Sequence, residues 1–209
     1  MKKAIIFDLD NTIYPVLPYA DKMFASLYEL INEYEEQREN MPEIRIALAR
    51  KAYMLVAAKF NFSKELRERG NELFESLTYD GPIAPFDDYK IARQMQCDKY
   101  LVTAGYALFQ QSKIDGLSLG KDFKEIHIVD ASKGQLTKKD VFSDIIDRYK
   151  YGLSEVLVTG DDVDSEIKAG LELGVDTVVY NQMGFDTGHT TSPIITNYSE
   201  LGTYTQPVK

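Results

Sequence analysis

The chain has 209 residues, which exceeds the commonest domain size and allows either one domain with a large insertion or two domains. Its 24 basic and 33 acidic residues give a formal net charge of −9, which argues against nucleic acid or an anionic membrane as partner, since both need a basic surface. The single cysteine, Cys97, excludes an intrachain disulfide and a cysteine-rich zinc site. With no signal peptide and no stretch that could span a bilayer, we expect a cytoplasmic protein.

Two carboxylates and a hydroxyl follow directly after a short apolar run near the start of the chain. Residues 4–7 are all apolar, as is typical of a strand buried on both faces of a parallel sheet, and Asp8, Asp10 and Thr12 come next. Because open α/β folds bind ligands at the carboxyl ends of their strands, we expect a site here. One carboxylate can attack a phosphate monoester and form an aspartyl-phosphate, while the second handles the protons. The alternative is an Asx-type turn that caps a strand.

A second apolar run ends in a hydroxyl and a glycine. Residues 100–102 are followed by Thr103, Ala104 and Gly105, which predicts another strand of the same sheet. The Thr103 hydroxyl can donate to a phosphoryl oxygen, and the backbone N–H groups of Ala104 and Gly105 lie at an expected strand-to-helix turn, where anions bind well. The alternative is that Thr103 is the N-cap of a helix that begins at Tyr106.

Two lysines open a later predicted helix. Thr137 and Asp140 resemble a capping box, and Lys138 and Lys139 lie between them in the first helical turn. Cations at this position oppose the helix dipole, so a nearby anion would explain them. We expect one lysine to bridge the nucleophilic carboxylate and the phosphate, and the other to be solvated. Lys138, four residues before Phe142, is the preferred choice.

Carboxylates crowd the end of a further predicted strand. Residues 156–160 are followed by Asp161, Asp162, Asp164 and Glu166. Such acids repel one another unless a cation lies among them, and Mg²⁺ takes oxygen ligands while it keeps several waters. Asp161 is the best ligand, and Glu166 is expected to ligate through water or to orient the lysine. Asp162 and Asp164 are also placed as N-cap and first-turn acids.

The rest of the pattern predicts an α/β core with an all-α insertion. Three apolar stripes at helical spacing precede Pro85, at residues 23–34, 48–56 and 66–77. From Phe86 onward helices and strands alternate, which favours a Rossmann-like, doubly wound, mainly parallel sheet with helices on both faces. We expect the final residues, from Gly202, to form a loose tail.

In combination these segments resemble the four motifs of the haloacid dehalogenase (HAD) superfamily. In order they are Phe7-Asp8-Leu9-Asp10-Asn11-Thr12, Leu101-Val102-Thr103-Ala104-Gly105, a lysine at the start of a helix, and Gly160-Asp161-Asp162 with Glu166. The resemblance runs from about residue 3 to residue 201. It departs from the usual pattern at Ala104, where Asn or Gly often stands, and at Glu166, where Asp is usual. Neither change removes a required chemical group.

The resemblance implies a Mg²⁺-dependent hydrolase in which Asp8 attacks phosphorus and Asp10 is the general acid and base. Asp8, the backbone carbonyl of Asp10 and Asp161 would hold the metal, with Asp162 and Glu166 in support. The threonine of the second motif and a lysine would hold the phosphoryl oxygens. The namesake dehalogenases lack an acid two residues after the nucleophile, so Asp10 favours phosphoryl transfer over cleavage of a carbon–halogen bond.

The resemblance also implies a core domain of residues 1–14 and 86–209 and a helical cap domain of residues 15–85 that closes over the site. Capped members act on small substrates, so we expect a small phosphorylated metabolite, such as a nucleoside 5′-monophosphate or a sugar phosphate. Residues 11–14 are similar to the pyrimidine 5′-nucleotidase-like group. The alternatives are a phosphomutase of the same fold and a non-catalytic ligand-binding module.

Overall fold

A six-stranded, fully parallel sheet forms the centre of the protein, in the strand order β3-β2-β1-β4-β5-β6. The computed structural model describes residues 1–130, 133–134 and 136–205. The strands are β1 (Ala4–Phe7), β2 (Asp98–Ala104), β3 (Glu125–Val129), β4 (Val156–Gly160), β5 (Asp176–Tyr180) and β6 (Ile194–Ile195). The predicted α/β class with a Rossmann-like parallel sheet is therefore confirmed.

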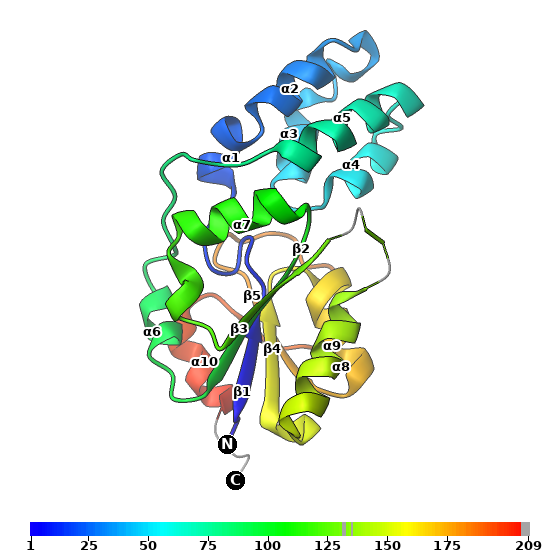
Figure 1. Ribbon diagram of the computed structural model, residues 1–209. Coiled ribbons are helices and arrows are strands. Elements are labelled where there is room, and N and C mark those ends of the chain that lie inside the picture. Colours follow the sequence, from blue (N-terminus) through cyan, green and yellow to red (C-terminus); the bar gives the residue numbers. More distant parts are fainter. Residues whose placement is uncertain (131–132, 135, 206–209) are drawn as a thin grey trace.

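Helices cover both faces of this sheet (Figure 1). Those in the core are α6 (Tyr89–Arg93), α7 (Ala107–Gly116), α8 (Lys138–Tyr149), α9 (Lys168–Leu173) and α10 (Tyr198–Thr205). Figure 1 shows α6, α7 and α10 on one side of the sheet and α8 and α9 on the other. Side chains alternate across a strand, so Ile5 and Phe7 pack on the first side, while Ala4 and Ile6 pack on the second.

Five further helices lie between β1 and β2, in what we call the helical segment (residues 17–76). They are α1 (Leu17–Met23), α2 (Ala25–Asn32), α3 (Met41–Leu48), α4 (Tyr53–Lys59) and α5 (Lys64–Ser76). Figure 1 places them together beyond the end of the sheet at which β1 and β2 finish. The all-α character predicted for this stretch is thus seen, whereas the boundaries of a core and a cap domain stay a prediction.

Two local predictions are wrong. The stripe at residues 48–56 is not one helix, because α3 ends at Leu48 and α4 begins at Tyr53, with the loop 49–52 between them. The N–H groups of Ala49, Arg50 and Lys51 still bond to carbonyls of α3, whereas the Ala49 carbonyl accepts from a side chain of the core. At the C-terminal end, residues 202–205 belong to α10 and are not a loose tail, since Leu201 anchors that helix in the core. The rest of the tail lies outside the described residues.

Across the residues that the structure describes, no helix combines the length and the apolar character that crossing a membrane requires.

Candidate active site

The register of the sheet brings three of the four motifs to one edge. Phe7, the last residue of β1, pairs with Leu101 in β2 and with Thr159 in β4, and these two strands end shortly beyond that level, at Ala104 and Gly160. The backbone N–H of Asp8 continues the ladder and donates to the Thr159 carbonyl at 3.0 Å. The first and fourth motifs therefore emerge side by side, because consecutive apolar residues bury all three strands in the sheet.

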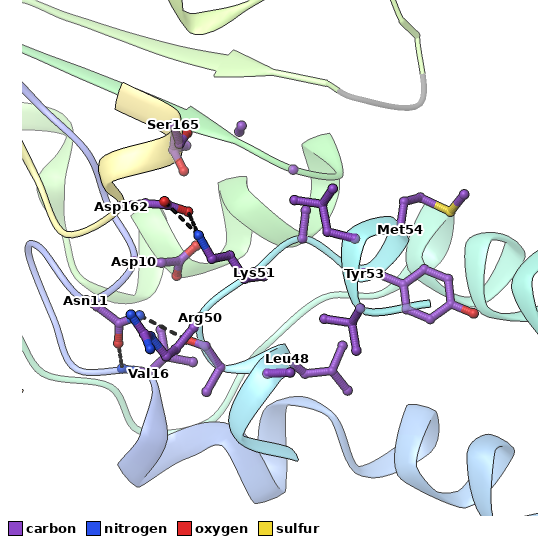
Figure 2. Close-up of a pocket in the computed structure, with 18 of the residues that line it drawn as sticks. Asp10, Asn11, Val16, Leu48, Arg50, Lys51, Tyr53, Met54, Asp162 and Ser165 are labelled. Carbon is purple, nitrogen blue, oxygen red and sulfur yellow. Dashed lines mark hydrogen bonds and ion pairs between the residues drawn. The ribbon is translucent and has the colours of Figure 1, made fainter. Parts of the chain in front are cut away.

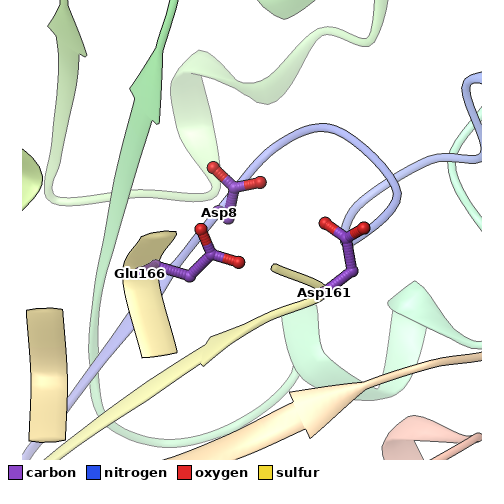
Figure 3. A group of neighbouring side chains, drawn as sticks. All are labelled: Asp8, Asp161 and Glu166. Carbon is purple, nitrogen blue, oxygen red and sulfur yellow. The ribbon is translucent and has the colours of Figure 1, made fainter. Parts of the chain in front are cut away.

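Three carboxylates meet at this edge. One oxygen from each of Asp8, Asp161 and Glu166 lies within 4.8 Å of the others, and Figure 3 shows the three groups turned toward a common space. Burial, which outweighs the opposing charge of Lys138, raises the pKa of Asp8 to about 7. Burial and the neighbouring charges of Glu166 and Asp8 also raise the pKa of Asp161 well above its ordinary value. The three carboxylates therefore carry more negative charge than Lys138 alone can neutralise.

The structure distinguishes the two lysines at the start of α8. The Nζ of Lys138 lies 2.7 Å from Asp8 Oδ1 and 2.7 Å from Glu166 Oε2, and the side chain is buried. Burial alone would lower the pKa of Lys138, but the two carboxylates raise it above its ordinary value, so the amine is protonated. Lys139 instead pairs with Glu172 at the surface. The predicted capping box that orients this turn is confirmed, with Thr137 at the N-cap.

Glu166 supports the lysine. Its Oε2 binds Lys138, and its Oε1 accepts from the backbone N–H of Asp162 at 2.7 Å, so both oxygens have donors. The residue lies in a π-helical turn, Val163–Ile167, a local form that is frequent at functional sites. A Cβ on Gly160 would lie 2.1 Å from Glu166 Oε1, so only glycine leaves room for this carboxylate. Of the two predicted roles for Glu166, the geometry favours orientation of the lysine.

Asp10 is held by donors that the sequence analysis missed. Lys113 of α7 places Nζ 2.7 Å from Oδ1 and 2.8 Å from Oδ2, Gln110 donates to Oδ2 at 3.1 Å, and the Tyr14 hydroxyl donates to Oδ1. Burial alone would raise the pKa of Asp10, but Lys113 and these hydrogen bonds hold it below its ordinary value. The carboxyl group is therefore ionised at neutral pH. Polar residues spaced i, i+3 on a helix that follows the second motif were the available signal.

The second motif lies at the same edge, with one difference from expectation. Thr103 is inside β2 and is buried, so it is not a helix N-cap. Its Oγ1 accepts from Gln110 Nε2 at 2.6 Å, which leaves the hydroxyl proton for another acceptor. The Gly105 N–H donates to the carbonyl of Val129 at 3.0 Å and is not free to bind phosphate. Ala104 ends the strand, and its carbonyl accepts from Gln110.

The carboxylates of the first and fourth motifs, with Thr103, Lys113 and Lys138, line one cavity of about 1170 Å³ between the core and the helical segment. The loop 49–52 lines it from the side of the helical segment (Figure 2). In this loop, the Ala49 carbonyl accepts from the Asn11 side chain at 2.9 Å, and Lys51 Nζ lies 2.7 Å from Asp162 Oδ1. The guanidinium of Arg50 donates to the carbonyl of residue 186 at 3.0 Å. The loop thus contacts the turns after β1, β4 and β5.

The donor set fits a hard divalent cation. Mg²⁺ prefers oxygen ligands, and Asp8 and Asp161 supply buried carboxylates whose pKa values burial and neighbouring acids raise. Among the described residues, none donates a hydrogen bond to the Asp161 carboxylate, whereas both oxygens of Glu166 have donors. The free oxygens of Asp8 and Asp161 would therefore hold the ion, beside the Lys138 ammonium.

The fold is shared with solved structures of low sequence identity. The magnesium-bound structure of the HAD-hydrolase YfnB of Bacillus subtilis has a TM-score of 0.59 and 20% identity, and covers 99% of both chains. A Clostridium difficile protein described as a phosphatase has a TM-score of 0.71 and 14% identity, over 98% of this chain and 99% of that one. The L-2-haloacid dehalogenase of Xanthobacter autotrophicus has a TM-score of 0.57 and 12% identity, over 97% and 98%. At these identities the likeness shows the fold alone.

Sequence similarity shows which family the chain belongs to. The match to YfnB of Bacillus subtilis (strain 168) has 25% identity and covers 86% of this chain and 84% of the relative. A family model for haloacid dehalogenase-like hydrolases matches residues 2–174. That span contains every carboxylate and lysine gathered around the cavity edge, from Asp8 to Glu166. The chain therefore belongs to the haloacid dehalogenase-like hydrolases.

Proposed function

We propose that the protein is a Mg²⁺-dependent phosphatase, which hydrolyses small phosphate monoesters through an aspartyl-phosphate on Asp8. The proposal depends mainly on one observation: two carboxylates with different hydrogen-bond and charge partners line the same cavity. Asp8 lies among Lys138, Asp161 and Glu166, whereas Asp10 is turned toward separate donors on α7. Two acids in different environments suit two different roles.

The first step would form the covalent intermediate. An Asp8 oxygen bonds to phosphorus, the bond to the leaving oxygen breaks, and that oxygen takes a proton from Asp10. The Lys138 ammonium and the Thr103 hydroxyl are placed to hold phosphoryl oxygens during this transfer. A bound Mg²⁺ would neutralise charge on the phosphoryl group, held by Asp8, Asp161 and, as the resemblance implies, the backbone carbonyl of Asp10.

The second step would release phosphate. Asp10 takes a proton from water, the water oxygen attacks phosphorus, and the Asp8 carboxylate is regenerated. The low pKa of Asp10 supports this step in particular, because the ionised form is the base. Because the low pKa leaves Asp10 ionised in the resting enzyme, Asp10 must take up a proton again, with substrate bound, before it can protonate the next leaving group.

Three considerations favour phosphoryl transfer within this family. An acid two residues after the nucleophile has no partner to act on in the displacement of a halide, which leaves as an anion. The relative YfnB has a magnesium-bound structure, and a neighbour by fold is described as a phosphatase. The helical segment would act as the cap, since its loop 49–52 lines the cavity and would exclude water and large substrates. Nucleoside 5′-monophosphates and sugar phosphates are the small esters to test first.

The test is hydrolysis of p-nitrophenyl phosphate with Mg²⁺ or with EDTA, by the wild type and by Asp8→Asn. We expect turnover only with Mg²⁺, and a loss of roughly three orders of magnitude or more in Asp8→Asn. A hydroxylamine-sensitive phosphoryl group should map to Asp8 by mass spectrometry.

Asp144→Asn is the matched control, because Asp144 is also ion-paired, with Arg148, but lies exposed on α8. Full activity of Asp8→Asn, or equal activity with EDTA, would refute the proposal. So would the absence of turnover on a broad panel of phosphate esters.

A further inference from the structure

Lys113 is a buried cation on α7 that the steps above do not use. Its side chain is 4% exposed, and Asp10 is its ion-pair partner among the described residues. A buried ammonium is unfavourable unless it is paired, and an apolar residue of similar volume is often at least as stabilising in such a place. Stability alone therefore gives little reason for a lysine at this position.

The pair is arranged with the carboxylate toward the cavity and the ammonium behind it. Asp10 is 29% exposed on its side chain, against 4% for Lys113. The ammonium lies over the ring of Phe109, 4.6 Å from the centroid, and 5.9 Å from the centroid of Tyr14. Because it is enclosed in this way, Lys113 can affect a substrate only through its contact with Asp10.

The contacts fix the direction of the carboxylate, and do not merely neutralise it. Lys113 Nζ is nearly equidistant from the two oxygens, at 2.7 and 2.8 Å, and Tyr14 and Gln110 each bind a different oxygen. Rotation of the carboxyl group would break at least one of these bonds, each of which involves a charged acceptor.

Gln110 extends the same arrangement to the phosphate-binding side. Its Nε2 faces Asp10 Oδ2, Thr103 Oγ1 and the carbonyl of Ala104, which forces the amide nitrogen toward them. The Oε1 is consequently buried with no hydrogen-bond partner among the described residues. An unpaired buried acceptor is destabilising, so the orientation toward Asp10 and Thr103 is kept at a cost in stability.

We propose that Lys113 is a positioning residue, which holds the Asp10 carboxylate in the direction needed for proton transfer to the leaving oxygen and from water. This inference rests on the proposed phosphatase function and adds a residue to it. Lys113 acts through Asp10 and does not touch the substrate. Its loss should therefore matter most where the leaving group needs a proton.

The experiment compares two esters that differ in this need. p-Nitrophenolate leaves without protonation, whereas the alkoxide of ethyl phosphate must be protonated. In Lys113→Met, we expect kcat/KM for ethyl phosphate to fall by roughly 100-fold, and for p-nitrophenyl phosphate by less than about tenfold. Binding should change little, and Lys113→Arg, which keeps the charge but has a larger and planar head group, should restore only part of the lost rate.

A double-mutant cycle then asks whether Lys113 acts through Asp10. In an Asp10→Asn background, Lys113→Met should cause no further loss on either ester. Lys124→Met is the matched control, because Lys124 also forms a 2.7 Å ion pair, with Asp98 at the start of β2. If Lys113→Met does not fold, as judged by circular dichroism, Lys113→Gln takes its place in the cycle.

The outcomes separate this inference from the proposed function. Equal losses on the two esters, or a loss that adds fully to that of Asp10→Asn, would show a structural role and overturn the inference alone. A wild type that hydrolyses neither ester would overturn the phosphatase proposal and this inference with it.

Discussion

Opposing effects set the pKa of the Asp8 carboxyl group, and a bound cation would favour its ionised form. Burial and the charges of Glu166 and Asp10 disfavour its ionised form, while Lys138 favours it, and the balance raises its pKa to about 7. A bound cation requires the ionised form. Protonation of Asp8 and binding of Mg²⁺ therefore compete near neutral pH.

We expect the affinity for Mg²⁺ to fall as the pH drops below about 7. Below that pH at least one proton must leave the pair Asp8 and Asp161 for each ion bound, so the apparent Kd should rise by about tenfold or more per pH unit, and it should level off where both carboxyl groups are ionised. Isothermal titration calorimetry at pH 6, 7 and 8, in two buffers of different ionisation enthalpy, measures both the affinity and the released proton. An affinity independent of pH over this range would contradict the expectation.

The two lysines of α8 offer a matched comparison. Lys138→Met should lower kcat/KM for phosphate esters by on the order of 10²–10³, because it removes a buried donor aimed at the reacting carboxylate. Lys139→Met removes only an exposed ion pair with Glu172 and should stay within about twofold of the wild type. Steady-state kinetics on one ester decides this. Comparable losses in both variants would mean that the helix start, and not the Lys138 amine, is what matters.

Residues in the motifs could be predicted from the sequence, whereas their partners could not. Asp8, Asp161 and Glu166 follow apolar strands of one sheet, so their convergence at one edge follows from the topology. Lys113 and Gln110 reach Asp10 across about a hundred residues of sequence. On a helix read alone they look like ordinary polar residues, and only packing of α7 against the first motif gives them a role.

At the scale of elements, the error at residues 48–56 had a physical cause. The apolar residues of α3 and α4 happen to continue in phase through the loop 49–52, which contains no glycine or proline to mark a break. The chain leaves the helix there because tertiary contacts compensate, including the bond from Asn11 to the Ala49 carbonyl. Local periodicity carries no information about such contacts.

The end of β4 and the π-helical turn after it depend on each other structurally. Gly160 has no side chain, and Glu166 folds back over it to reach Lys138 and the Asp162 N–H. In Gly160→Ala, the new Cβ would collide with Glu166, whose displacement breaks both contacts. We expect the free energy of unfolding to fall by ~1–3 kcal/mol and the hydrolase activity to fall with it.

Gly120→Ala is the control for this change, because a Cβ at Gly120 meets nothing within 4 Å. Chemical denaturation gives the free energy of unfolding, and activity is measured on the same samples. Wild-type stability and activity in Gly160→Ala would show that Glu166 does not depend on this space.

At the scale of the whole molecule, the proposed substrates are anions that would have to enter a cavity in a protein of net charge −9. Positive charge at the cavity comes from Lys138 on the core and from Arg50, Lys51 and Lys59 on the helical segment, whereas the charge of Lys113 is neutralised by Asp10. Lys51 also joins the two parts, since its Nζ lies 2.7 Å from Asp162 Oδ1. Its side chain is 33% exposed and that of Asp162 is 18% exposed, so the pair adds little to stability.

Loss of Lys51 should therefore affect capture of the substrate more than folding or chemistry. In Lys51→Met, we expect KM for a phosphate ester to rise by roughly tenfold, with kcat within about threefold of the wild type, because local charge guides the anion against the overall field. The difference in KM should shrink at 0.5 M salt, where exposed charges are screened at about 4–5 Å. Lys64→Met, which removes an exposed lysine elsewhere in the helical segment, should leave KM unchanged. An equal change in both variants would mean that total charge, and not the contact of Lys51 with the core, controls capture.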